Sequence, residues 1–164
     1  MPALTAGKTA PQFALTSTTG QKVSLADALK AGPVLVAFFK VSCPTCQFTL
    51  PFLQRMYETF GGSNFTLWGI SQNDARDTRA FNQEYGVRFP VLLDESGFPV
   101  SNQYGITNVP TLFLISPDGS IQVSSVGFAK ADLETIAAEA ARATLKSPTP
   151  IFKPGEVVPQ YKPG

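Results

Sequence analysis

The feature that most constrains the fold is an apolar run that ends just before the only two cysteines of the chain. Val34–Phe39 reads VLVAFF, and the cysteines follow at positions 43 and 46 within KVSCPTCQ. A β-prone run without polar alternation predicts a central strand that is covered on both faces. The following residues, 43–60, predict a helix, because Pro44 suits its first turn and Gly61 and Gly62 end the pattern. Pro51 should kink this helix.

The rest of the chain alternates strand and helix signals. We expect a β-hairpin over residues 10–25, strands over 65–70 and 90–94, and helices over 74–86, 99–104 and 132–145. Residues 109–115 and 121–126 predict an antiparallel hairpin around a type I turn at 116–119. This order predicts an α/β fold with a mixed central sheet flanked by helices, preceded by an N-terminal β-hairpin extension and containing an inserted αβ element.

The length of 164 residues fits one domain, which we assign to residues 1–145. Residues 146–164 carry five prolines and therefore predict a Pro-rich extended C-terminal tail. Such a tail is either a disordered end or a segment that lies across the domain, with Ile151, Phe152 and Tyr161 as its anchors.

Charge and composition exclude several classes of function. The formal net charge is +1 with scattered charges, so no basic patch predicts binding to nucleic acid. The absence of histidine excludes Ser-His and Cys-His nucleophile pairs and histidine-ligated metals. A zinc site would need two further ligands of Cys or His type, so we expect no metal and no cofactor.

No segment reaches the roughly 18 apolar residues that suggest a membrane span, and the N-terminus lacks the apolar stretch of a secretory signal. The sequence as given predicts a cytoplasmic protein, or a periplasmic or exported one if a signal segment was removed.

The spacing of the two cysteines favours redox chemistry. Cys43 is expected at a helix N-terminus, where unpaired N–H groups and the helix dipole stabilise a thiolate. Cys46 lies one turn further on the same face, close enough to form a disulfide with it. A purely structural disulfide that closes so short a loop would remove little conformational entropy from the unfolded chain, so it would stabilise the fold only slightly. We therefore expect Cys43 to attack a substrate disulfide and Cys46 to resolve the mixed disulfide.

These motifs, together with several others, resemble the thioredoxin superfamily. Within it the chain is similar to the redoxin (AhpC/TSA-like) branch, which contains TlpA/ResA-like thiol-disulfide oxidoreductases and their peroxiredoxin relatives. The resemblance covers about residues 7–145 and includes Pro51 as the helix kink. Its motifs are APQFALTSTTGQKVSL, VLVAFFKVSCPTC, GISQND, YGVRFPVLLD and GITNVPTLFLISPDG.

The resemblance implies a substrate site around the cysteines. In this superfamily the proline that faces the Cys-x-x-Cys motif is cis, and the residue before it presents its backbone to the substrate like an added strand. Here these residues are Pro110 and Val109. Three further residues are expected to contact the substrate: Ser42, which stands where the family usually has an aromatic residue, Pro44 and Thr45.

The implied activity is that of a protein-disulfide oxidoreductase, and the resemblance favours a disulfide reductase with antioxidant activity. Its expected partners are a disulfide-containing or thiol protein substrate and an upstream redox donor, and the protein itself is expected to be a monomer.

Two departures from the family pattern concern the proton that Cys46 must lose. Thioredoxins carry a buried acid where this chain has Ala37, and many ResA-like proteins carry a glutamate where it has Thr49. Water and Lys40, three residues before Cys43, are the remaining candidates for proton transfer.

Two other functions stay open. The first is a peroxiredoxin-like thiol peroxidase, in which Thr45 and Arg76, Arg79 or Arg88 would contact the peroxide. The peroxiredoxin proline and threonine upstream of the cysteine are absent, since Val36 and Lys40 occupy their positions. The second is a non-catalytic redox-sensing or peptide-binding module with the same site chemistry.

Overall fold

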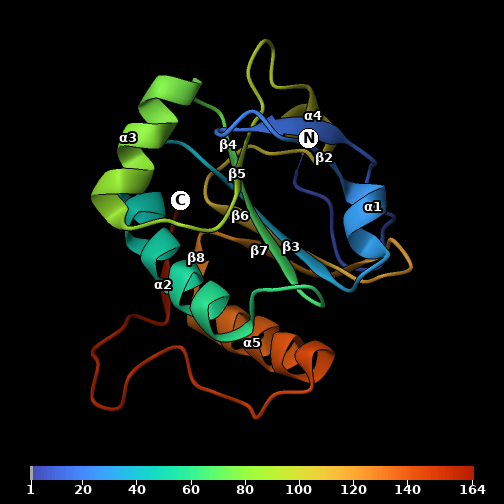
Figure 1. Ribbon diagram of the computed structural model, residues 1–164. Helices are drawn as coiled ribbons and strands as arrows, with labels where there is room; N and C mark the ends of the chain where they lie inside the picture. The colour runs from blue at the N-terminus through green and yellow to red at the C-terminus, as the bar shows by residue number, and fades with distance from the viewer. Residues whose placement is uncertain (1) are drawn as a thin grey trace.

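A seven-stranded mixed sheet forms the centre of the computed structural model, which describes residues 2–164 (Figure 1). Its strand order is β2-β1-β5-β4-β3-β6-β7. The strands of this sheet are β1 (Ala14–Ser17), β2 (Lys22–Ser24), β3 (Val34–Phe39), β4 (Thr66–Ser71), β5 (Val91–Leu93), β6 (Thr111–Ile115) and β7 (Ile121–Val126). The helices are α1 (Leu25–Leu29), α2 (Pro44–Phe60), α3 (Ala75–Tyr85), α4 (Pro99–Gln103) and α5 (Lys130–Thr144).

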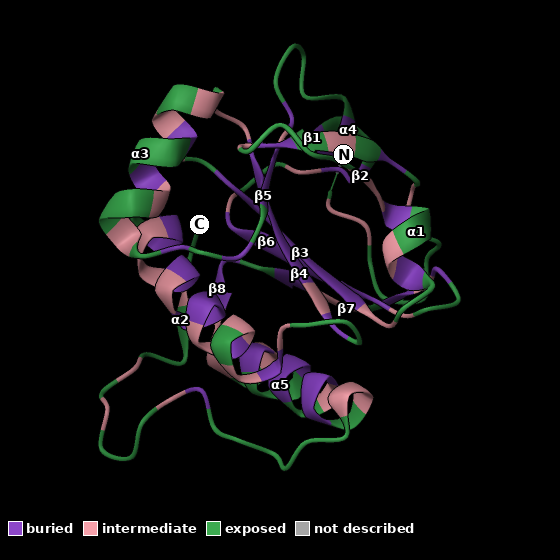
Figure 2. Ribbon diagram, viewed as in Figure 1, coloured by how far each residue is buried: buried purple, intermediate pink, exposed green. Residues whose placement is uncertain are grey.

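The helices cover both faces of the sheet, and this explains the apolar run in β3 (Figure 2). Successive side chains of a strand point to opposite faces. Leu35, Ala37 and Phe39 pack in a core with residues of α2, α3 and α5, whereas the alternate residues of β3 pack on the other face with α1 and α4. The predicted α/β fold with a mixed sheet flanked by helices is therefore confirmed.

The neighbours of β3 decide what lies near its carboxyl end. β3 is parallel to β4 but antiparallel to β6, with Phe38 opposite Thr111. Antiparallel partners start where their neighbours end. The loop that follows β3 and carries Cys43 therefore meets the loop that precedes β6 and carries Pro110.

Two parts of the fold differ from the sequence prediction. The hairpin expected over residues 10–25 gives way to α1 at Leu25, where the hydroxyl of Ser24 accepts a hydrogen bond from the amide of Asp27. A helix of five residues is too short to show an apolar period. β6 begins at Thr111 rather than at residue 109, because Val109 and Pro110 belong to the preceding loop.

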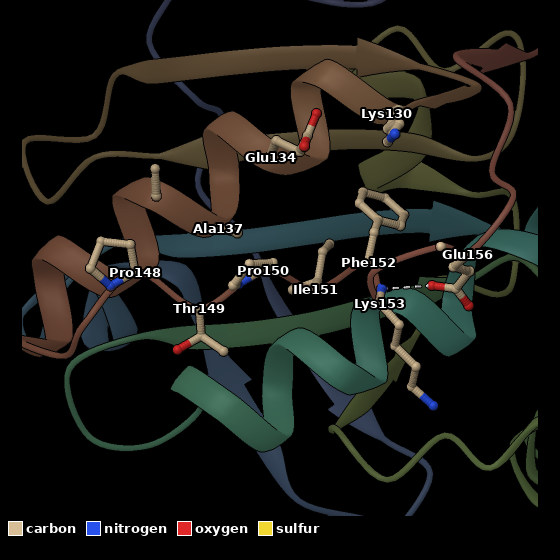
Figure 3. A pocket seen from close by; sticks show the side chains of 12 residues that line it. Lys130, Glu134, Ala137, Pro148, Thr149, Pro150, Ile151, Phe152, Lys153 and Glu156 are labelled. Carbon is tan, nitrogen blue, oxygen red and sulfur yellow. Dashed lines mark hydrogen bonds between the residues drawn. The ribbon is translucent and has the colours of Figure 1, made fainter.

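Residues 146–164 follow α5, and residues 148–156 run between α5 and α2 (Figure 3). Ile151 is buried, and the ring of Phe152 lies 5.1 Å from that of Phe52 in α2. Arg55 in α2 binds both carboxylate oxygens of Glu156, at 2.8 and 2.9 Å. Two of the expected anchors, Ile151 and Phe152, thus contact the domain.

Beyond these contacts the chain returns to the sheet side of the molecule. β9 (Tyr161–Lys162) pairs antiparallel with β8 (Phe128–Ala129), a pairing that the proline content had led us not to expect. The expectation that Tyr161 is an anchor was wrong for its side chain, which is 55% exposed; only its backbone is held, opposite Ala129. The last residue lies near the N-terminal end of α2 (Figure 1).

Within residues 2–164, we find no helix whose length and apolar character would let it cross a membrane.

The ion pair between Arg55 and Glu156 predicts an acid-sensitive attachment of the tail. The hydrogen bonds from Arg55 lower the pKa of Glu156 from 4.5 to about 2. A lowered pKa in the folded state stabilises the attachment above pH 4.5, and this stabilisation is lost as the pH falls toward 2. NMR titration of the Lys153 amide, which donates to Glu156, should report a midpoint near the lower value.

An Arg55→Ala variant should move that midpoint up toward 4.5, whereas Arg142→Ala, which removes an exposed arginine paired with Glu139, should leave it unchanged. A midpoint near 4.5 in the unaltered protein would contradict the ion pair.

Candidate active site

Cys43 stands at the N-terminus of α2 and is its N-cap residue. Its Sγ accepts a hydrogen bond from the Cys46 amide at 3.1 Å, and its S–H lies 3.4 Å from the Val109 carbonyl oxygen, to which it donates. The side chain is partly exposed, and both cysteines are free thiols. The Cys43 sulfur is thus open to solvent and lies between an N–H donor and a carbonyl acceptor.

Cys46 lies in a different environment one helical turn further along. It is fully buried in the core between the sheet and α2, against residues such as Ala37 and Leu50. Burial raises the pKa of the Cys46 thiol far above its ordinary value, and the hydrogen bond with Cys43 raises it further. Cys46 therefore remains protonated until the surroundings of the pair change.

Two side chains that we did not single out from the sequence hold the loop before Cys43. The Asn73 side-chain oxygen accepts from the Val41 amide, and the Gln47 side-chain amide donates to the Val41 carbonyl, both at 3.0 Å. These bonds satisfy both backbone groups of Val41 and fix the approach to the site. Asn73 belongs to the GISQND motif, but no local signal in that motif indicates a partner more than thirty residues away.

The loop before β6 provides the opposite wall of the site. The Val109–Pro110 peptide bond is cis. The Pro110 carbonyl accepts from the Gly127 amide at 2.7 Å, and the Thr111 hydroxyl donates to the Asn108 carbonyl at 2.7 Å. These bonds hold the Val109 carbonyl next to the sulfur of Cys43.

The other expected substrate contacts differ in how accessible they are. Ser42 and Pro44 are exposed beside Cys43, as a binding rim requires. Thr45 is instead buried, and its hydroxyl donates to the carbonyl of Pro163 at 2.6 Å. The chain's own tail therefore occupies one of the expected substrate contacts.

The neighbours of Cys46 include no carboxylate where relatives carry one. Ala37 is buried against it, and the buried Thr49 hydroxyl donates to the Thr45 carbonyl at 2.7 Å. Lys40 is exposed, and its backbone hydrogen bond and positive charge lower the pKa of Cys46, although less than burial raises it. Lys40 thus favours the charged form of Cys46, and its part in proton transfer stays a prediction.

The three arginines considered for peroxide binding are engaged elsewhere. Arg76 pairs with Asp77, Arg79 donates to the Thr18 carbonyl, and Arg88 pairs with Glu58. None of these contacts is with the cysteine motif. The arrangement expected for a peroxide site, with a threonine hydroxyl and an arginine beside the sulfur, is not formed by these residues.

Comparison with known proteins decides the family. A sequence model of the AhpC/TSA family matches residues 6–124. The chain belongs to the AhpC/TSA family. It is 31% identical over 125 residues to the thiol-disulfide oxidoreductase ResA of Bacillus thuringiensis, a match that covers 74% of this chain and 69% of that protein.

Two solved structures extend this AhpC/TSA assignment to the fold. The thioredoxin domain of a thiol-disulfide oxidoreductase from Bacteroides vulgatus superposes with a TM-score of 0.72 at 27% identity, over 83% of this chain and 97% of that one. A thiol:disulfide interchange protein from Bacteroides sp. gives 0.72 at 25% identity, over 90% and 94%. The predicted resemblance and the predicted activity, thiol-disulfide oxidoreduction, are confirmed.

The contrast between the two sulfurs predicts selective alkylation. Iodoacetamide at neutral pH should modify Cys43 in the folded, reduced protein, because its sulfur is partly exposed and at the helix N-terminus. Cys46 should react only after unfolding, because it is buried and its pKa is raised. Peptide mass spectrometry identifies the modified residue. Modification of Cys46 first, or of both at equal rates, would contradict the arrangement.

Proposed function

We propose that this protein is a disulfide reductase in which Cys43 attacks and Cys46 resolves. The observation that carries the proposal is the position of the Cys43 sulfur, which accepts a hydrogen bond from the Cys46 amide and donates one to the Val109 carbonyl. An incoming disulfide would meet a partly exposed sulfur and a backbone edge that can orient it. The direction, reduction rather than oxidation, rests on resemblance to the family.

The reaction consists of two thiol-disulfide exchanges. The Cys43 thiolate attacks one sulfur of the substrate disulfide, the substrate S–S bond breaks, and the second substrate sulfur leaves as a thiolate that takes up a proton. The Cys46 thiol then loses its proton and attacks the Cys43 sulfur. The mixed disulfide breaks, and the second substrate thiol is released. The substrate gains two electrons, and the protein is left with a Cys43–Cys46 disulfide.

The buried state of Cys46 has a role in this sequence. Because the pKa of Cys46 is raised, its thiol does not compete with Cys43 for the substrate in the first step. In the mixed disulfide Cys43 is no longer a thiol, so its hydrogen bond ceases to hold the Cys46 pKa up. Lys40, whose charge favours the Cys46 thiolate, is our candidate for assisting the proton transfer to water.

The surrounding residues would bind the substrate. Val109 and the cis Pro110 would offer backbone to an extended substrate segment, as in β-strand addition. Ser42 and Pro44 would form the exposed rim, and Thr45 would donate a hydrogen bond from its hydroxyl.

An upstream donor must return two electrons to the Cys43–Cys46 disulfide after each cycle. We propose that the protein acts as a monomer. The proposal holds in either compartment expected from the sequence, because the reduction potential of the donor sets the direction of net electron transfer.

Substitution of each cysteine separates the two steps. In an insulin-reduction assay, Cys43→Ser should abolish turnover because no nucleophile remains. Cys46→Ser should also stop turnover but should accumulate a covalent complex with the substrate, visible on non-reducing gels. Normal turnover in both variants would refute the roles given to the cysteines, and a complex trapped by Cys43→Ser would reverse them.

Peroxide provides the test against the alternative activity. Because the three arginines are engaged elsewhere and Thr45 donates to Pro163, hydrogen peroxide should oxidise the reduced protein no faster than an ordinary exposed thiolate. Stopped-flow oxidation of the unaltered protein, with Cys46→Ser as the control that lacks the resolving thiol, measures this rate. Rapid and saturating consumption of peroxide would support a peroxidase instead.

A further inference from the structure

The final residues of the chain lie on the groups that we assign to substrate binding. The Thr45 hydroxyl, inside the cysteine motif, donates to the Pro163 carbonyl at 2.6 Å. Gly164 lies so close to the loop before β6 that a Cβ added to it would come within 2.2 Å of the Val109 carbonyl oxygen. Only a residue without a side chain approaches this carbonyl so closely. The two contacts place the chain's own backbone beside Cys43 and the Val109–Pro110 peptide.

The residues before these contacts are held in the manner of a bound peptide. β9 adds to β8 as an antiparallel strand, with Phe128 opposite Lys162. The Lys130 amide donates to the Gln160 carbonyl at 2.9 Å. The ammonium group of Lys162 lies over the Phe48 ring at 4.9 Å from its centroid. Backbone pairing plus one side-chain contact is how sheet edges bind extended peptides.

We propose that residues 160–164 are an intramolecular pseudosubstrate, which occupies the substrate's place until a protein substrate displaces it. This inference rests on the proposed function, because it identifies the substrate site as the one at Thr45 and Val109. It also states what must bind there. An extended segment with a small residue beside its disulfide, a free carbonyl for Thr45 and a basic side chain for Phe48 would reproduce the contacts of Gly164, Pro163 and Lys162 with Val109, Thr45 and Phe48.

The attachment of the tail differs along its length. Residues 151–156 are firmly held, since Ile151 is buried and Glu156 binds Arg55. The part that follows begins with Val157, which is 97% exposed, and its contact with the core comes from the partly buried Val158, besides the backbone pairing and the contacts given above. Segments with few buried apolar contacts and exposed backbone hydrogen bonds open at low cost. Residues 157–164 can therefore leave the site while residues 151–156 stay in place.

A cavity of about 410 Å³ between α5 and residues 148–156 is consistent with such a tether (Figure 3). The tail spans the cavity and is held at separate points rather than packed along α5. A tether this short keeps the released end at an effective concentration in the mM range, so it closes again when the substrate leaves. A protein substrate must therefore bind tightly enough to displace a segment that is present at this effective concentration, and a weakly bound substrate would leave the site closed.

The first experiment removes the occupant and keeps the tether. Deletion of residues 157–164 leaves Ile151 and Glu156 in place. It should raise the rate of Cys43 alkylation by iodoacetamide by roughly fivefold or more, because a modest preference for the closed state corresponds to a factor of this size. Insulin reduction should rise in parallel. Val157→Ser, at a tail residue whose side chain is almost fully exposed, is the matched control and should change neither rate.

Two point variants and a peptide guard against an effect of truncation on folding. Gly164→Val cannot fit against the Val109 carbonyl and Lys162→Ala loses the contact with Phe48, so each should accelerate alkylation in the full-length chain. The peptide VVPQYKPG, residues 157–164, should slow alkylation of the deletion variant at mM concentration, whereas a scrambled peptide should not.

The two readouts distinguish failure of this inference from failure of the proposed function. Unchanged alkylation in the deletion and point variants, with normal insulin reduction, would overturn the pseudosubstrate while the reductase stands. Faster alkylation without insulin reduction by any form would confirm that the tail occludes Cys43 but overturn the assignment of a disulfide substrate site. Slower alkylation after deletion would show that the tail supports the site, and would overturn the inference.

Discussion

The antiparallel pairing of β6 with β3 is the constraint on which the site depends. β3 ends at Phe39, four residues before Cys43, and β6 starts at Thr111, next to Pro110. Had β6 run parallel to β3, as β4 does, its leading loop would lie at the opposite edge of the sheet. The pairing thus brings the Val109 carbonyl to the Cys43 sulfur across 66 positions of sequence. Without it the cysteine motif would stand alone at the end of a helix.

The same helix gives its two cysteines opposite properties. At its first turn Cys43 is the N-cap residue, and its partly exposed sulfur accepts a hydrogen bond from the Cys46 amide. One turn further on, Cys46 enters the core that β3 and α2 share, where the loss of water disfavours a charge. In the proposed mechanism this difference orders the two exchanges, because the substrate reaches the partly exposed Cys43 before the buried Cys46. A carboxylate next to Cys46 is not required to create that order.

The tail adds a second level of control to the proposed chemistry. It pairs with β8 and contacts Thr45 and Val109, two of the residues to which we assign substrate binding. In the proposed arrangement a substrate must compete with a tethered segment for these contacts. Selectivity then depends on the difference between the two affinities, and not on the substrate's affinity alone.

The sequence by itself determined the local parts of this protein. The unbroken apolar run of Val34–Phe39 required a covered strand, and the spacing of Cys43 and Cys46 placed two sulfurs on one face of a helix start. It did not indicate the roles of Asn73 and Gln47, or that residues 161–162 form a strand. These depend on contacts between residues that are distant in the chain, and neither propensity nor periodicity carries information about such partners. Only the tertiary structure decided that the Thr45 hydroxyl donates to the Pro163 carbonyl. Every residue has a backbone carbonyl, so the packing of the tail, and not the residue type, selects the acceptor.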